Sequence, residues 1–109
     1  MVIAENINVV NNEPKFRFEV FLNGEYAFLE YRYYKKDIAF IHTVVPNIFK
    51  GRGIATAMAI VALDFAKDQH LKIMLLCPFV SKYVREHPDY HSLVDTDYHP
   101  SFGNKGKQQ

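Results

Sequence analysis

The chain of 109 residues contains a single cysteine, no tryptophan and no long apolar run. Cys77 cannot form a disulfide within the chain, so it is either a small buried hydrophobic residue or a working thiol in a reducing compartment. No apolar segment approaches the roughly 18 residues of a membrane span. Residues 1–12 also lack the charged and then apolar segments of a secretion signal. We therefore expect a cytoplasmic protein that does not associate with membranes.

A large excess of charge of either sign is also absent, since the formal net charge is +1. With 49% hydrophobic and 15% aromatic residues, this balance indicates a packed chain rather than a disordered or polyanion-binding one. A chain of this length can bury roughly two-thirds of its unfolded surface. We expect one domain over residues 1–100, then a polar, disordered tail over residues 101–109. We also expect a monomer or weak dimer that binds no nucleic acid.

Alternating apolar residues dominate the first half of the chain. They predict a strand over residues 16–22, and Asn23-Gly24 is the strongest short signal for a hairpin turn. The register that a two-residue loop fixes pairs Leu22 with Glu25, Val20 with Ala27, Phe18 with Leu29 and Phe16 with Tyr31. On the other face of the hairpin, Arg17 is expected to pair with Glu30 as opposite charges.

The remaining elements alternate between strand and helix. Residues 38–45 are apolar on both parities, which predicts a strand covered on two faces, and Pro46 ends it. Apolar residues recur at helical spacing from Gly53 to Phe65, for about four turns. Residues 72–77 predict a buried strand, and Pro78 opens a second helix that Pro88 stops. This order predicts an α/β (α+β) fold, a mainly antiparallel mixed sheet that leads into a βαβ crossover.

The segment Lys50-Gly51-Arg52-Gly53 lies directly before the first helix, and no acidic residue follows it until Asp64. Glycines let backbone N–H groups approach a ligand closely, and a helix N-terminus offers unpaired donors and a partial positive charge. Phosphate suits such a site, and the two cations would add charge-assisted contacts. The alternative is an ordinary turn with solvated cations, because short glycine motifs are weak signals.

Two segments of the chain resemble a known family. Residues 43–59, TVVPNIFKGRGIATAMA, resemble motif A of the GNAT (GCN5-related N-acetyltransferase) superfamily, with Lys50, Gly53 and Ala55 at its three defining positions. Lysine departs from the usual arginine or glutamine at the first of these. Residues 75–90, LLCPFVSKYVREHPDY, are similar to the segment typical of small single-domain GNAT-like proteins of the YidJ type. The resemblance covers residues 16–90 and implies a minimal GNAT fold with acetyl-CoA-dependent N-acetyltransferase activity.

The resemblance also implies where acetyl-CoA binds, in a V-shaped opening between the two parallel strands. The resemblance implies that its pyrophosphate binds the loop of Lys50, Gly51, Arg52, Gly53, Ile54 and Ala55, and that its pantetheine arm pairs with the backbone at about residues 42–45, including Thr43, Val44 and Val45. Thr56 is a further residue expected to bind the coenzyme. Lys82 would reach a coenzyme phosphate and Tyr83 loosely matches the family's proton donor; a solvated lysine and a packing tyrosine are the alternatives. The segment that encloses the acceptor in larger members is missing at Asn23-Gly24, which implies an open, poorly selective acceptor site.

The transfer itself needs a base for the amine, donors for the oxyanion and a proton for the leaving thiolate. Many family members use a glutamate as base, but residues 38–45 contain none, and His42 is the only side chain there that exchanges a proton near neutral pH. The alternative for His42 is a core histidine that shares the parity of Phe40 and Val44. Cys77 would be the N-cap of the next helix, where a thiol is activated. It is a candidate nucleophile or acid, or an inert buried cysteine.

Two other clusters are rejected as sites. The histidines and aspartates of residues 87–99 match no established spacing of metal ligands. The aromatic segment YAFLEYRYY, beside Lys35 and Lys36, resembles a stacking platform for single-stranded nucleic acid, but half of it belongs to the expected core face. The leading hypothesis is an N-acetyltransferase for an unidentified amine. The alternative is a coenzyme-A-binding or sensing module without efficient transfer.

Overall fold

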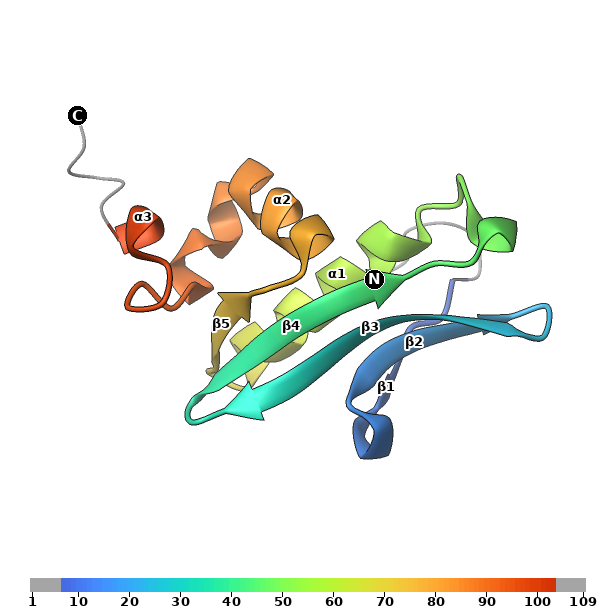
Figure 1. The fold of residues 1–109 in the computed structure, drawn as a ribbon, viewed down its shortest axis with the longest axis horizontal. Coiled ribbons are helices and arrows are strands. Elements are labelled where there is room, and N and C mark those ends of the chain that lie inside the picture. The colour runs from blue at the N-terminus through green and yellow to red at the C-terminus, as the bar shows by residue number, and fades with distance from the viewer. Residues whose placement is uncertain (1–6, 104–109) are drawn as a thin grey trace.

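The computed structural model describes residues 7–103 and shows one mixed sheet with helices packed against it (Figure 1). The strands lie in the order of the sequence and are β1 (Val10–Asn12), β2 (Arg17–Leu22), β3 (Glu25–Tyr34), β4 (Asp37–Val44) and β5 (Lys72–Leu75). The α-helices are α1 (Ile54–Asp68), α2 (Pro78–Glu86) and α3 (Pro100–Gly103). Short 3-10 segments are η1 (Glu13–Lys15), η2 (Asn47–Phe49) and η3 (Pro88–Leu93). The expected α+β class is confirmed.

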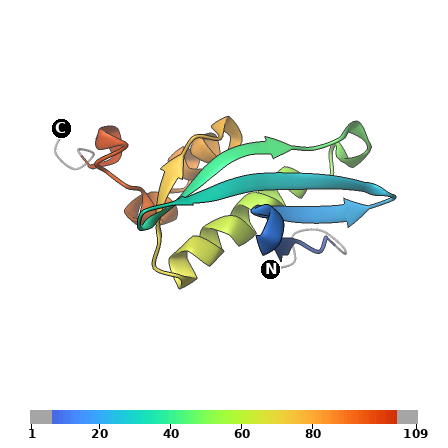
Figure 2. The same cartoon turned by 60° about the horizontal axis from the view of Figure 1, so that its bottom comes forward.

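The sheet is antiparallel except at its last pair, where β4 and β5 run parallel. α1 connects these two strands, so the predicted βαβ crossover is present. α1 runs along one face of the sheet (Figures 1 and 2) and buries its apolar side against it, including Met58, Ala62 and Leu63. The opposite face of β2 and β3 exposes Phe21 and Tyr26. The core therefore lies between the sheet and α1.

The predicted hairpin between β2 and β3 is confirmed in its register. Asn23 and Gly24 have φ of 54° and 80°, as this turn requires, and Val20 lies opposite Ala27. The expected ion pair between Arg17 and Glu30 is wrong, although the two residues are opposite each other. Arg17 Nε donates instead to the Glu19 carboxylate at 2.7 Å. The two side chains can meet because residues two positions apart on one strand point to the same face of the sheet.

β4 carries one extra residue relative to β3. Glu30 lies opposite His42, whereas the next residue of β3, Tyr31, lies opposite Phe40, so Ile41 is bulged out of the pairing. A bulge reverses the alternation of faces. Phe40 is buried in the core, while His42 turns to the exposed face. The prediction that residues 38–45 are covered on both faces is therefore right before the bulge and wrong after it.

The chain after α2 packs along the outer edge of β5, which the sequence did not predict. Val94 bridges to Ile73, and the backbone N–H of Leu75 donates to Nε2 of His99 at 2.8 Å. Burial, and secondly the positive charge of Arg85, lowers the pKa of His99, which keeps that nitrogen available as an acceptor. Residues 101–103 of the expected tail belong to α3, and the rest of that tail lies outside the described residues.

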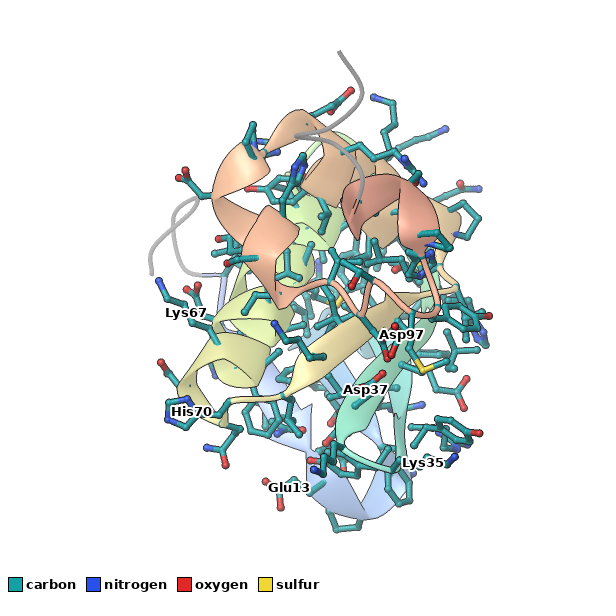
Figure 3. The ribbon with its side chains drawn as sticks, turned by 90° about the vertical axis from the view of Figure 1, so that its left-hand side faces the viewer. Glu13, Lys35, Asp37, Lys67, His70 and Asp97 are labelled. Atoms are coloured by element: carbon teal, nitrogen blue, oxygen red, sulfur yellow. The ribbon has the colours of Figure 1, made fainter. Side chains whose placement is uncertain are left out.

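Carboxyl groups meet where this C-terminal segment reaches the start of β4. Figure 3 shows Asp37 beside Asp97, and Asp95 lines the same cavity. Burial, followed by the hydrogen bond and charge of Asp95, raises the pKa of Asp37 to about 6, and that hydrogen bond lowers the pKa of Asp95. The folded chain thus holds a proton on Asp37 more tightly than the unfolded chain does.

We expect Asp37→Asn to stabilise the chain at pH 7.5 by about 1 kcal/mol. The side-chain amide of the asparagine can donate a hydrogen bond to Asp95 at any pH, whereas the Asp37 carboxyl must first take up a proton. In the wild-type chain the contribution of protonated Asp37 is complete below its ordinary pKa of 3.8 and is lost as the pH rises through about 6. Urea unfolding between pH 4 and 7.5 should show that the free energy of unfolding depends less on pH in the variant than in the wild type. Asp68→Asn, an exposed change at the end of α1, is the control. The same dependence of the unfolding free energy on pH in the wild type and in Asp37→Asn would contradict this account.

Candidate functional site

β4 and β5 separate at one end and leave a V-shaped opening. Their pairing ends at Phe40 and Leu75, and the next two N–H groups, of Leu76 and Cys77, both donate to the Phe40 carbonyl at 3.1 and 2.8 Å. From there the chain turns into α2, whereas β4 continues to Val44. Within residues 7–103, residues 41–44 have no strand partner on the side of β4 that faces away from β3. This unpaired edge lies where the pantetheine arm is expected, at Thr43, Val44 and Val45.

The glycine loop forms an uncapped helix N-terminus beside this opening. Gly51 and Gly53 have φ of 78° and 74°, a region that favours glycine, and Gly53 is the N-cap of α1 without any side-chain cap. The first helical hydrogen bond runs from the N–H of Ala57 to the carbonyl of Gly53 at 2.9 Å. The N–H groups of residues 54–56 therefore have no acceptor within the helix, and no acidic residue lies in this first turn.

The two cations of the loop are available to a ligand. Lys50 and Arg52 are exposed, and neither takes part in an ion pair among residues 7–103. The structure therefore brings together the unpaired N–H groups, the left-handed glycines and the positive side chains that the sequence predicted. This combination can bind a phosphate or pyrophosphate group.

A cavity of about 280 Å³ lies between the first turn of α1 and α2. Three predicted residues line it together, namely Thr56, Lys82 and Tyr83. Lys82 already pairs with Glu86, with 2.7 Å between Nζ and Oε2, and the ring of Tyr83 stacks on that of His87 at 3.9 Å. The lysine is therefore exposed but partnered, and the tyrosine is held in a stack.

Cys77 is the N-cap of α2, as predicted, and its side chain is buried with 1% exposure. Its sulfur lies 3.2 Å from the hydroxyl oxygen of Thr43, across the base of the opening. No pattern in the sequence predicts this contact, which joins residues 34 positions apart.

His42 lies on the other face of β4 from Thr43, because neighbouring residues of a strand point to opposite faces. Its Nε2 is 3.2 Å from Oε1 of Glu30, and its ring meets the ring of Phe28 edge to face at 6.1 Å. The side chain is 48% exposed, so the alternative of a core histidine is wrong. The structure does not bring His42 and Cys77 into contact, and they do not form a Cys–His couple.

Glu30 is the functional candidate that sequence reasoning missed. Residues 38–45 contain no glutamate, and the carboxylate beside His42 comes from Glu30 of the neighbouring strand β3. Glu30 also pairs with Arg32 at 2.8 Å. Glu30 lies opposite His42 because of the bulge at Ile41. No pattern in the sequence predicts that bulge.

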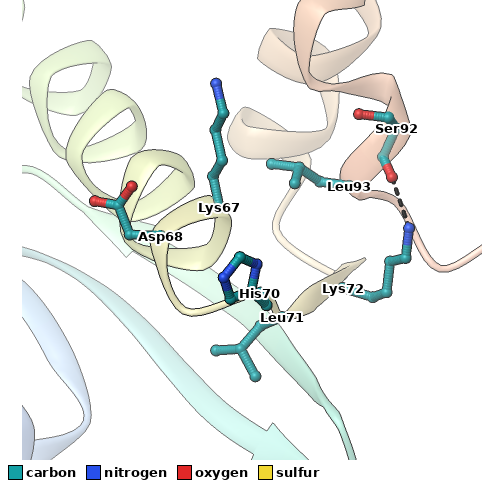
Figure 4. Close-up of a pocket in the computed structure, with 7 residues that line it drawn as sticks. All are labelled: Lys67, Asp68, His70, Leu71, Lys72, Ser92 and Leu93. Carbon is teal, nitrogen blue, oxygen red and sulfur yellow. Dashed lines mark hydrogen bonds between the residues drawn. The ribbon is translucent and has the colours of Figure 1, made fainter.

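Other parts of the molecule offer weaker sites. The cavity at the far end of α1, shown in Figure 4, is lined by Lys67, Asp68, His70, Leu71, Lys72, Ser92 and Leu93. Lys72 Nζ there donates to the carbonyl of Ser92 at 2.8 Å. The part of the chain that the structure describes holds no group of three or more histidine, cysteine or acidic residues suited to a metal ion. No helix in residues 7–103 has the length and hydropathy needed to cross a membrane.

Comparison with known proteins agrees with this architecture. A family model described as GCN5-related N-acetyl-transferase matches residues 17–93. The chain is 41% identical over 88 residues to Protein NATD1 of Xenopus tropicalis, which covers 78% of this chain and 81% of that protein. It is 42% identical over 85 residues to Protein NATD1 of Homo sapiens (75% of each) and 37% identical over 93 residues to that of Danio rerio (81% and 84%). The chain therefore belongs to the GCN5-related N-acetyltransferase family.

Proposed function

We propose that the protein is an N-acetyltransferase that binds acetyl-CoA in the opening between β4 and β5 and transfers the acetyl group to an amine. The observation that carries the proposal is the uncapped N-terminus of α1, with Gly51 and Gly53 in left-handed conformation, beside the unpaired edge of β4. The first feature suits a pyrophosphate and the second suits an extended amide-bearing arm.

The residues of the opening would contact acetyl-CoA along its length. The N–H groups of residues 54–56, with Lys50 and Arg52, would hold the pyrophosphate. The backbone of residues 43–45 would pair with the pantetheine amides. The cavity at Thr56, Lys82 and Tyr83 adjoins the first turn of α1, so it would receive a part of the coenzyme that lies next to the pyrophosphate.

Acetyl-CoA supplies a thioester carbonyl that an amine attacks and a thiolate that departs. In this proposal His42 takes the proton from the attacking amine, since its imidazole is half exposed and is a side chain that general bases often use. Glu30 orients the His42 ring and stabilises its charged form. Cys77, hydrogen-bonded to Thr43, would give its proton to the departing thiolate. Cys77 would then take a proton from solvent, to which His42 releases the proton of the amine.

The test is the release of free thiol from acetyl-CoA in the presence of a broad panel of amines. We expect release with the wild-type chain and a loss of nearly all of it in a Cys77→Ala, His42→Ala double variant. Thiol release no greater than that of the double variant, together with retained binding of acetyl-CoA, would replace the enzyme by a coenzyme-A-binding or sensing module. An intact mass taken after exposure to acetyl-CoA separates direct transfer, which leaves no adduct, from an acyl-cysteine at Cys77.

A further inference from the structure

Two side chains meet at the base of the opening, Thr43 from β4 and Cys77 from the start of α2. The Thr43 hydroxyl oxygen lies 3.2 Å from the Cys77 sulfur, so one of the two groups donates a hydrogen bond to the other. Each group carries one hydrogen, and a single contact uses only one of them. Within residues 7–103 neither side chain takes part in another hydrogen bond. The pair therefore keeps one hydrogen that it can donate to a third group.

The fold brings these two side chains together. The N–H group of Cys77 donates to the Phe40 carbonyl at 2.8 Å, which holds the start of α2 against β4. The bulge at Ile41 reverses the alternation of faces, so Thr43 points to the same face as Leu29, the core residue opposite it. Without the bulge, strict alternation would turn Thr43 to the other face, away from Cys77.

Thr43 is the member of the pair that a ligand would meet first. Cys77 is only 1% exposed, whereas Thr43 is half-buried. Thr43 also belongs to residues 41–44, the stretch of β4 with an unpaired edge, along which the pantetheine arm is proposed to lie. Since the thioester ends that arm, its sulfur would lie nearer to the hydroxyl of Thr43 than to the thiol behind it.

The proposed base and this pair lie on opposite faces of β4. His42 is on the exposed face beside Glu30. Thr43 and Cys77 are on the core face. The base therefore cannot pass the proton of the amine directly to the departing thiolate, which needs a proton source of its own. A thiol is a stronger acid than an alcohol, so Cys77 suits the source and Thr43 suits the group that passes the proton on.

We propose that the Thr43 hydroxyl, rather than the Cys77 thiol itself, donates the proton to the departing thiolate, and that Cys77 replaces that proton. The inference rests on the proposed function, because it names a further residue of the same transfer. As the C–S bond of the thioester breaks, the Thr43 O–H bond breaks and an S–H bond forms on coenzyme A. In the same step the Cys77 S–H bond breaks and a new O–H bond forms on Thr43. Cys77 is left as a thiolate, which takes a proton from solvent.

The first measurement tests the hydrogen bond without any substrate. Cys77 is the only cysteine of the chain, so the infrared S–H stretching band of the full chain reports on this one thiol. We expect a lower frequency and a broader band in the wild type and in Thr43→Ser than in Thr43→Val, which nearly keeps the shape of threonine but has no hydroxyl. The same band in all three chains would show that the thiol does not donate to Thr43, and would overturn the inference.

The second measurement follows thiol release from acetyl-CoA. We expect Thr43→Val to lower kcat about 10²-fold, as for loss of a general acid, and Thr43→Ser to retain most of it. The affinity for coenzyme A should change less than about twofold, because the backbone of this strand binds the arm. Cys77→Ala should lower kcat no more than Thr43→Val, and should cost nothing further when added to it, because the two groups act as one unit. Thr96→Val, at an exposed threonine of the C-terminal segment, is the matched control.

The results separate the relay from the transferase. A much larger loss of kcat in Cys77→Ala than in Thr43→Val would show that the thiol donates directly, against the inference. Equal losses in Thr43→Ser and Thr43→Val, or a comparable loss in Thr96→Val, would also contradict it. In each of these cases the transferase itself would stand. A wild-type chain that binds acetyl-CoA but releases no thiol with any amine of the panel would overturn the transferase, and the relay with it.

Discussion

Ala55→Asp is expected to weaken the binding of acetyl-CoA about 100-fold while it leaves the chain as stable as the wild type or slightly more so. A carboxylate in the first turn of α1 compensates the helix dipole, which favours folding. The same carboxylate repels a pyrophosphate at the unpaired N–H groups of residues 54–56. Calorimetric titration with acetyl-CoA and thermal unfolding measure the two effects on one sample.

The control for Ala55→Asp is Gln69→Glu, which adds the same charge at the other end of α1. We expect its affinity for acetyl-CoA to stay within about twofold of the wild type, because exposed charges so far apart are largely screened. An Ala55→Asp chain that binds acetyl-CoA as well as the wild type would show that the glycine loop is only a turn.

His42→Ala is expected to lower kcat about 10²- to 10⁴-fold, the usual contribution of a general base, with little change in the KM for acetyl-CoA. Glu30→Gln should lower kcat about tenfold, since the amide still contacts the ring but cannot stabilise its charged form. Steady-state kinetics with the amine that the panel identifies will measure both changes.

The matched control for His42→Ala is His70→Asn, which removes an exposed histidine at the far end of α1 (Figure 4). His70 has φ of 58°, a conformation that asparagine tolerates. Its kcat should stay within about twofold of the wild type. If His42→Ala retained full kcat, the base would have to be another group, and the role given to Glu30 would fall with it.

Features set by short stretches of the chain were predictable. The Asn23-Gly24 turn fixes its own register, because a two-residue loop with positive φ leaves one pairing. The helix that begins after Gly53 and the N-cap position of Cys77 follow from local spacing and from Pro78. The uncapped helix N-terminus could likewise be inferred from residues that are adjacent in the sequence.

Features that depend on pairing between distant segments were not predictable. The bulge at Ile41 depends on how β4 pairs with β3. It places His42 on the exposed face of the sheet, whereas strict alternation would place it on the core face with Phe40. The same bulge supplies Glu30 as its partner from another strand. The contact of Thr43 with Cys77 and the packing of His99 on β5 likewise join residues that only the folded chain brings together.

The central claim is that backbone N–H groups at the start of α1 bind the pyrophosphate of acetyl-CoA. The most direct measurement is a titration of the ¹⁵N-labelled full chain with coenzyme A, followed by amide resonances. The account predicts that the amides of Gly51, Gly53, Ile54 and Ala55 shift most, together with those of residues 43–45. A spectrum that does not change, or changes confined to the cavity at Lys67 and His70, would contradict it.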